Sequence, residues 1–322
     1  DWSSDVCSSD LCTVRPDVVT YASVLNAFAR RGDFDGAMKV YKTQLDDFRL
    51  KGNTRAKPND RTFGALISAC SRSKNTSNAP EVAEGILNTV SDLHSEGDID
   101  EGPNAFMYSS VIDCWRKSQR QEAPRRALGI LKTMILRYKE DGNEKVRPDA
   151  FTYASVMGTY AKQGDGRGAN KVWKMMKEDV RAGNKKAKPD ARIYSILIDA
   201  WVRSNNPRAP KEAESLLKAM GNYFFKGDLD EGPDFIAYNS VINCWSKSNR
   251  TEAPERAFDI LKAMVSKYKA GAKNLRPDRV VYGAVMGAHA KRGDIDGAKE
   301  VWKMMTDDYR DRSEEHTSEL QS

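Results

Sequence analysis

Arg-Pro-Asp-Val-Val-Thr-Tyr, residues 15–21, decides the fold, because versions of this stretch return at a nearly fixed interval along the chain. In each version a proline precedes Asp or Asn, and an aromatic residue follows four positions later. The seven prolines are Pro16, Pro58, Pro103, Pro148, Pro189, Pro233 and Pro277, at intervals of 41 to 45 residues. Such a period is typical of a solenoid, in which each repeat buries its apolar face only by stacking on its neighbours.

Within every repeat the apolar residues follow the period of an α-helix. After the aromatic residue, most repeats place further apolar side chains three, four and seven positions later, as in 108–115. A second segment starts at a small Ala and continues with the same spacing, as in 127–134. This spacing predicts two amphipathic helices per repeat, and no segment alternates as a strand would. We therefore expect an all-α fold, a right-handed α-solenoid of helix-turn-helix repeats.

The turns between the paired helices differ in a regular way. Repeats one, four and seven have short Gly-Asp turns, at 32–33, 164–165 and 293–294. The other four insert residues that end in Ala-Pro, with Pro80, Pro124, Pro210 and Pro254 expected near the first helical turn, where the missing N–H costs least. The array is thus expected to be a block of three repeats that occurs twice, followed by one repeat of a third copy.

The two termini do not share this pattern. Residues 1–11 are the translation of a common sequencing-library adapter, and residues 312–322 are the translation of its reverse complement. We expect both to be adapter-derived artefacts, and residues 12–311 to form one continuous solenoid with a truncated last repeat. Residues 12–311 hold 51 Lys and Arg against 40 Asp and Glu, so the net charge is +11 rather than +6. This excess favours a polyanionic partner or a solubilising surface.

Three stretches resemble the pentatricopeptide repeat family: Pro-Asp-Val-Val-Thr-Tyr (16–21), Tyr-Asn-Ser-Val-Ile (238–242) and Ala-Phe-Asp-Ile-Leu-Lys-Ala-Met (257–264). The resemblance spans residues 16–311, although the family's repeat of thirty-five residues is shorter than these. The superhelix it implies is similar to that of tetratricopeptide repeats, whose own signature is absent here. It also implies single-stranded RNA as partner, about one base per repeat, and residence in a mitochondrion or plastid. No cofactor and no catalytic residue are expected.

In the family, the base is read by two positions of each repeat. One lies five residues after the Asp or Asn that starts the repeat, and the other is the Asp or Asn that starts the next repeat. The pairs expected to read RNA bases are Ser109 with Asp149, Ser195 with Asp234, and Asn239 with Asp278. The resemblance implies guanine for Ser with Asp and uracil for Asn with Asp, so repeats three to six would read G, any base, G and U. Asp and Asn are also good helix N-caps, which alone could explain their position.

A Lys or Arg stands eight residues after each of the first reading positions. These cations are Arg30, Arg72, Lys117, Lys162, Arg203, Lys247 and Lys291. A groove that follows a phosphate backbone needs one cation per repeat at a fixed place. A cation at a helix C-terminus also complements the helix dipole. Since that role would tolerate a shift of one or two residues, the fixed position favours contact with the RNA backbone.

Two alternative functions remain open at the level of sequence. The same groove could bind a peptide, which would make the chain a protein-binding scaffold. The repeats could also be the RNA-recognition arm of a larger enzyme whose catalytic domain lies elsewhere. His289 is expected in the core, the cysteines lack a C-x-x-C pattern for metal or disulfide roles, and Asp98–Gly102 is expected to be a turn. No apolar run approaches the roughly 20 residues of a membrane helix, so no membrane contact is expected.

Overall fold

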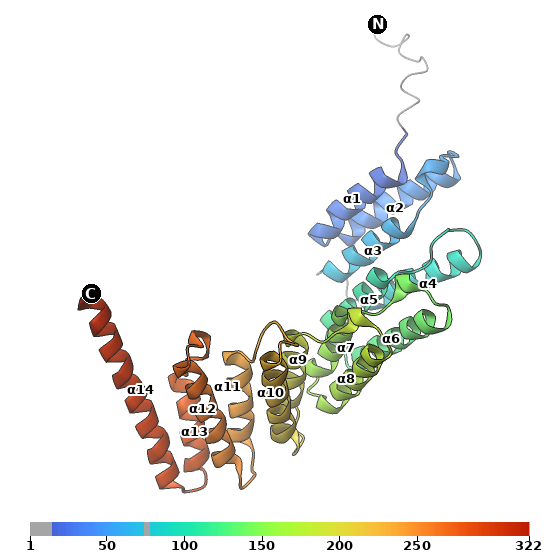
Figure 1. The fold of residues 1–322 in the computed structure, drawn as a ribbon. Helices are drawn as coiled ribbons and strands as arrows, with labels where there is room; N and C mark the ends of the chain where they lie inside the picture. Colours follow the sequence, from blue (N-terminus) through green and yellow to red (C-terminus); the bar gives the residue numbers. More distant parts are fainter. Residues whose placement is uncertain (1–14, 74–77, 322) are drawn as a thin grey trace. The chain divides into compact units, whose positions relative to one another are not determined.

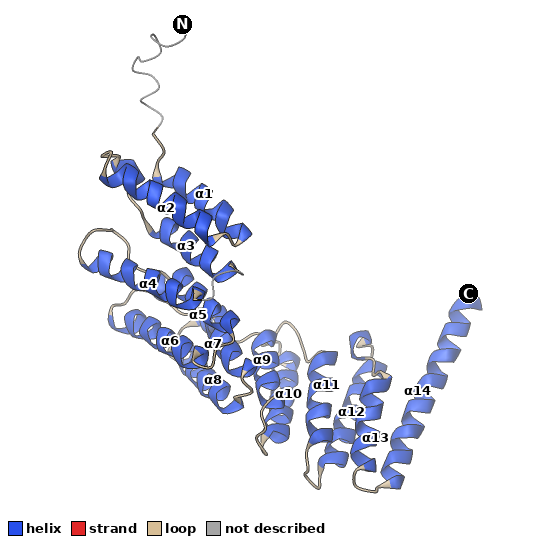
Figure 2. Cartoon of the chain, turned by 180° about the vertical axis from the view of Figure 1, so that it is seen from behind, coloured by secondary structure: helices blue, strands red, loops and turns tan. Residues whose placement is uncertain are grey.

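The computed structural model describes residues 15–73 and 78–321, and only the backbone of residues 311–321. The adapter-like segment 1–11 therefore lies outside the described residues. Over the described range the chain consists of α-helices joined by turns and four 3₁₀ helices, with no strand (Figures 1 and 2). The predicted all-α fold with two helices per repeat is confirmed.

The helix boundaries follow the repeats. The first helices are α1 (Val18–Arg31), α3 (Asp60–Arg72), α5 (Ala105–Ser118), α7 (Ala150–Lys162), α9 (Ala191–Val202), α11 (Phe235–Lys247) and α13 (Arg279–Ala290). The second helices are α2 (Phe34–Arg49), α4 (Ala79–Ser95), α6 (Ala123–Glu140), α8 (Gly166–Arg181), α10 (Ala209–Phe225), α12 (Ala253–Lys269) and α14 (Ile295–Gln321). The backbone of α14 stays helical into the segment 312–321.

The described chain divides into two compact units. The first reaches Thr159 and also takes in Glu178–Ala187, while the second comprises Tyr160–Lys177 and the part from Lys188 onward. In the first unit α1 packs on α3 and α3 on α5, and in the second α9 packs on α11 and α11 on α13. Second helices lie against their own first helix and that of the next repeat, as α4 does with α3 and α5. Within each unit the first helices thus form one layer and the second helices another.

Turn chemistry starts the second helices as the sequence predicts. In the short turns of repeats one, four and seven, Oδ1 of Asp33, Asp165 and Asp294 accepts the N–H three residues later at 2.8, 2.8 and 2.9 Å. In the other four repeats, proline is the second residue of the helix, where no intrahelical N–H bond is lost.

Each linker between repeats contains a buried residue that the sequence pattern did not predict. Four of the six linkers contain a 3₁₀ helix: η1 (Thr54–Ala56), η2 (Glu144–Val146), η3 (Lys185–Ala187) and η4 (Lys273–Leu275). The other two are turns. Besides the prolines, every linker buries an apolar side chain, from Ala56, Ile99, Val146, Ala187, Leu229 and Leu275.

Tyrosine hydroxyls join the two helices of repeats one, four and seven. Tyr21 donates to Asp47 at 2.6 Å, Tyr153 to Asp179 at 3.1 Å and Tyr282 to Asp308 at 3.2 Å. Each aspartate lies 26 residues after its tyrosine and is buried. Burial and the hydrogen bond to Asp47 raise the pKa of Tyr21 to about 12. The hydroxyl therefore stays protonated, and it satisfies a carboxylate that would otherwise be costly to bury.

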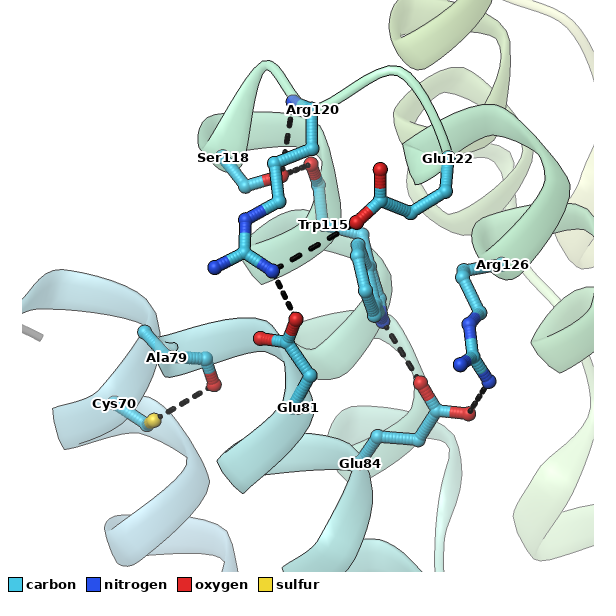
Figure 3. Close-up of polar contacts among 9 residues, drawn as sticks. All are labelled: Cys70, Ala79, Glu81, Glu84, Trp115, Ser118, Arg120, Glu122 and Arg126. Atoms are coloured by element: carbon cyan, nitrogen blue, oxygen red, sulfur yellow. Dashed lines mark hydrogen bonds and ion pairs between the residues drawn. The ribbon is translucent and has the colours of Figure 1, made fainter. Parts of the chain in front are cut away.

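A polar cluster joins repeats two and three (Figure 3). The indole N–H of Trp115 on α5 donates to Glu84 of α4 at 3.1 Å, and Arg126 of α6 binds the other oxygen of Glu84 at 3.4 Å. Arg120 reaches Glu81 of α4. The pair of Glu84 with Arg126 recurs 130 positions later, where Arg256 binds Glu214 at 3.0 Å. This recurrence supports the predicted duplication of a three-repeat block.

The left-handed backbone requires glycine in all three Gly-Asp turns, and a close contact adds a second reason in two of them. Gly32, Gly164 and Gly293 have φ of 70°, 66° and 69°, in the left-handed region. A β-carbon would lie 2.5 Å from the carbonyl oxygen of Arg72 at Gly32, and 2.7 Å from that of Arg203 at Gly164. At Gly293 it would meet nothing within 4 Å. The turn thus sets how closely the next first helix can approach.

We predict that Gly164→Ala destabilises the chain more than Gly293→Ala does. The left-handed backbone costs each variant about 1–2 kcal/mol. The clash with the Arg203 carbonyl adds about 1–3 kcal/mol at Gly164 alone. Urea unfolding followed by circular dichroism measures the difference, with Gly293→Ala as the matched control. Equal losses would show that the close approach carries no energetic weight.

Candidate nucleic-acid interface

The Asp or Asn that starts each repeat caps the first helix. Oδ1 of Asp17, Asn59, Asn104, Asp149, Asp190, Asp234 and Asp278 accepts the N–H three residues later, at 2.8 to 3.3 Å. At Asp17, hydrogen bonds from Thr20 lower the pKa of the carboxyl. In the five aspartate caps, only one of the two side-chain oxygens is used. Capping therefore fixes the position of the side chain and leaves Oδ2 of each aspartate for another partner.

The three polar reading residues lie in different surroundings. Ser109 is buried, 7% exposed, and its Oγ lies 2.7 Å from Oγ1 of Thr152. Ser195 is exposed and donates to the carbonyl of Ala191 at 3.2 Å. Asn239 is half-buried and accepts from Nδ2 of Asn243 at 2.8 Å. The structure thus offers Ser195 most openly to a ligand.

One of the expected pairs is physically connected. Thr152 lies between Ser109 and Asp149, because its Oγ1 also donates to Oδ1 of Asp149 at 2.7 Å. Within the described residues no hydrogen bond joins Ser195 to Asp234 or Asn239 to Asp278. Sequence reasoning identified the members of each pair but missed Thr152.

The seven cations lie at the C-terminal ends of the first helices, with different partners. Arg30, Arg72 and Lys247 are exposed and form no ion pair among the described residues. Arg203 pairs with Asp199 at 2.7 Å, and Lys162 is exposed.

Two cations of the same series are anchored to the preceding repeat. Lys117 donates to the carbonyl of Ser71 at 3.0 Å and pairs with Asp113, and Lys291 donates to the carbonyl of Ser246 at 2.9 Å. Each of these carbonyls lies near the end of the preceding first helix. Lys117 and Lys291 therefore satisfy orphan carbonyls as well as presenting positive charge.

Comparison with known proteins supports the repeat assignment. The family model described as the pentatricopeptide repeat domain matches residues 12–72 and 138–204, and the model of the single PPR repeat matches residues 280–309. The chain belongs to the pentatricopeptide repeat family. A pentatricopeptide repeat-containing protein of Arabidopsis thaliana is 24% identical over 165 residues, which is 51% of this chain. The aligned part covers 25% of that relative's length.

The pentatricopeptide repeats also present an exposed apolar residue that sequence reasoning missed. It stands two positions after the cap and is 42–69% exposed in Val19, Phe106, Phe151, Ile236 and Val280. Repeats two and five have Arg61 and Arg192 there. The signal was available, because these residues fall outside the buried helical stripe. The Phe106 ring of repeat three would lie 3.5 Å from a β-carbon on Gly64, the first expected reading position of repeat two.

The remaining candidates lie where the sequence predicted or nearby. His289 is buried, and its Nδ1 lies 2.7 Å from Oδ2 of Asp294, so it belongs to the core of repeat seven. Cys70, Cys114 and Cys244 are buried and free, and burial raises the pKa of Cys244 to about 11. Asp98–Gly102 is a loop that bends at residues 98–100, and Ile99 is buried in it. None of the described helices combines the length and the apolar character needed to cross a bilayer.

We predict that Asp234→Ala destabilises the chain by about 1 kcal/mol through loss of the cap, whereas Asp234→Asn leaves stability nearly unchanged. Asn keeps the Oδ1 that accepts the N–H of Ala237 at 2.8 Å. Chemical denaturation measures both variants. Asp230→Ala removes the same charge from a nearby exposed position and serves as control. Equal effects of Ala and Asn at residue 234 would exclude the capping role.

Proposed function

We propose that this chain binds single-stranded RNA along its first helices and acts in RNA processing, stability or translation in a mitochondrion or plastid. The observation that carries the proposal is the repeated surface of the first helices. Near each N-terminus lie a cap with a second side-chain oxygen available in the aspartates and, in five repeats, an exposed apolar side chain. At each C-terminus lies a cation.

The chemistry of this surface fits a single strand. An apolar or aromatic side chain offers a stacking face to any base, and the neighbouring polar side chains can distinguish base edges. The cation comes eight residues after the first reading position, about 12 Å along the helix. A sugar-phosphate backbone could thus run beside the cations while the bases face the caps. We propose that residues 12–311 act as one array, with the terminal peptides taking no part.

Two other functions make different predictions. A peptide-binding scaffold could use the same exposed apolar residues, but its affinity would depend little on salt. An RNA-recognition arm of a larger enzyme would bind RNA as proposed here, and the 25% coverage of the Arabidopsis relative is compatible with a longer protein. On this proposal the repeats carry no catalytic residue, and catalysis would come from a separate domain.

We predict a strong salt dependence of RNA binding. If six or seven cations each contact a phosphate, the slope of log affinity against log salt is about −4 to −5, because each contact with a single strand contributes about −0.7. Fluorescence anisotropy with a labelled single-stranded RNA, at increasing potassium chloride, measures this slope. A slope near zero would favour the scaffold function.

Charge reversal provides the second test of the same surface. We predict that Arg30→Glu, Arg72→Glu and Lys247→Glu together weaken binding to all RNA sequences alike and make the salt slope shallower. These three residues have no ion pair among the described residues, so their replacement breaks none of the ion pairs seen there. The control triple variant, Lys188→Glu, Lys226→Glu and Lys273→Glu, changes the net charge equally in the linkers. Equal weakening by both sets would mean that net charge, rather than this series of cations, drives binding.

We also predict a base preference in the order of the repeats. Selection from a randomised RNA pool, read 5′ to 3′ by repeats three to six, should enrich G strongly for repeat five and U for repeat six, with at most a weak excess of G for repeat three and any base for repeat four. Asn239→Ser should move the last position from U toward G by about 1 kcal/mol. A change at another position, or at none, would refute the base-reading assignment even if RNA still binds.

A further inference from the structure

Two of the expected reading pairs are chemically identical and yet lie in different surroundings. Ser109 with Asp149 and Ser195 with Asp234 occupy the same positions in repeats three and five. Ser109 is buried, whereas Ser195 is exposed. The third residue after the aspartate also differs, because it is Thr152 in one case and Ala237 in the other.

The direction of the hydrogen bonds around Thr152 follows from the number of protons. The Thr152 hydroxyl lies 2.7 Å from Oδ1 of Asp149, and an ionised carboxylate can only accept. Thr152 therefore donates its single hydroxyl proton to Asp149. In the 2.7 Å contact between the two hydroxyls, Thr152 must accept and Ser109 must donate. Ser109 then has no proton left for an acceptor atom of a base.

Burial makes it costly for the Ser109 hydroxyl to break its hydrogen bond with Thr152. Thr152 is fully buried and Ser109 is 7% exposed. If Ser109 turned toward a ligand, the buried contact between the hydroxyls would be lost without replacement by water, and a buried polar group left unpaired is destabilising.

Repeat five has no corresponding restraint. In the part of the chain that the structure describes, Oδ1 of Asp234 accepts only the backbone N–H of Ala237, at 2.8 Å. The Ser195 hydroxyl donates to the carbonyl of Ala191 in its own helix at 3.2 Å. That carbonyl is already part of the helical hydrogen-bond pattern, and Ser195 is exposed, so its hydroxyl can turn to a ligand at little cost.

The hydroxyl-to-hydroxyl contact is specific to repeat three in this sequence. From repeat one to repeat six, the first reading residue and the residue three positions after the next cap are Ala22 and Thr62, Gly64 and Met107, Ser109 and Thr152, Ala154 and Ile193, Ser195 and Ala237, Asn239 and Val281. Only the third of these combinations places a hydroxyl on both sides.

We propose that Thr152 is a specificity-determining positioning residue, which keeps the Ser109 hydroxyl hydrogen-bonded inside the protein. Repeat three then discriminates weakly between bases, while repeat five discriminates strongly. This inference rests on the proposed function. It deepens that function, because two identical reading pairs would discriminate between bases to different degrees. The difference would be set by a third residue that need not touch the RNA.

The test measures the ratio of dissociation constants for two synthetic RNAs that differ in one base. The probes are the selected motif with guanine or adenine at the position of repeat three, and a second set altered at the position of repeat five. In the unmodified chain we expect a ratio near one at repeat three and about fivefold at repeat five, the discrimination of one ordinary hydrogen bond.

Substitution of Thr152 distinguishes its hydrogen bond to Ser109 from a general structural role of this residue. Thr152→Val keeps the shape, removes the hydroxyl and leaves the backbone cap on Asp149 in place, so the ratio at repeat three should rise to about fivefold. Thr152→Ser retains the hydroxyl and should leave the ratio near one. The ratio at repeat five is the internal control, since loss of folding would change both positions together.

The reciprocal variant makes the test independent of the stability of Thr152→Val. Ala237→Thr should create the same contact with Ser195 and lower the ratio at repeat five toward one. Equal ratios at repeats three and five in the unmodified chain would overturn the inference. So would an unchanged pattern in both Thr152→Val and Ala237→Thr while repeat five still discriminates. Absence of RNA binding by the unmodified chain would instead refute the proposed function and the inference with it.

Discussion

The rest of the structure depends on one hydrogen bond repeated along the chain, from a backbone N–H in the first turn of each first helix to the side chain of the preceding Asp or Asn. The bond satisfies a donor that the helix cannot pair internally. It also fixes where each first helix begins, and hence which residues face the core, the neighbouring repeat and the solvent. Any reading of bases by this chain would start from side chains that the cap has already placed.

Much of the fold could be predicted because its causes are local. The proline and the cap start each first helix, the spacing of apolar residues predicts its buried face, and Gly-Asp or Ala-Pro starts the second helix. The sequence pattern did not predict the buried linker residues Ala56 and Leu275. It also did not predict the pair of Tyr21 with Asp47. These features join residues of different elements, and they leave only a weak trace in the periodicity of the sequence. The 26-residue interval from tyrosine to aspartate in repeats one, four and seven was nevertheless a usable signal.

The candidate site shows the same division between local and distant causes. Sequence reasoning located the polar positions and the cations, because they recur at fixed intervals. It could not say which of these side chains are already engaged. Ser109 and Ser195 look identical in the sequence, but Thr152 engages only Ser109, from the next repeat. Lys117 and Arg72 occupy equivalent positions, but only Lys117 is bonded to the preceding helix among the described residues. Burial and competing partners depend on which repeats are neighbours, and periodicity does not encode that.

The anchored lysines have a consequence for the entropy of binding. A long charged side chain that becomes immobile at an interface costs about 0.5–1.5 kcal/mol. Lys117 and Lys291 have already lost much of that freedom in the folded chain, because a carbonyl of the preceding repeat holds each ammonium group. An anion that meets them encounters a preorganised charge, whereas Arg30 and Arg72 must be ordered on contact. If the chain binds RNA as proposed, the series of cations combines groups that are ordered only on contact with groups that are held in place before the strand arrives.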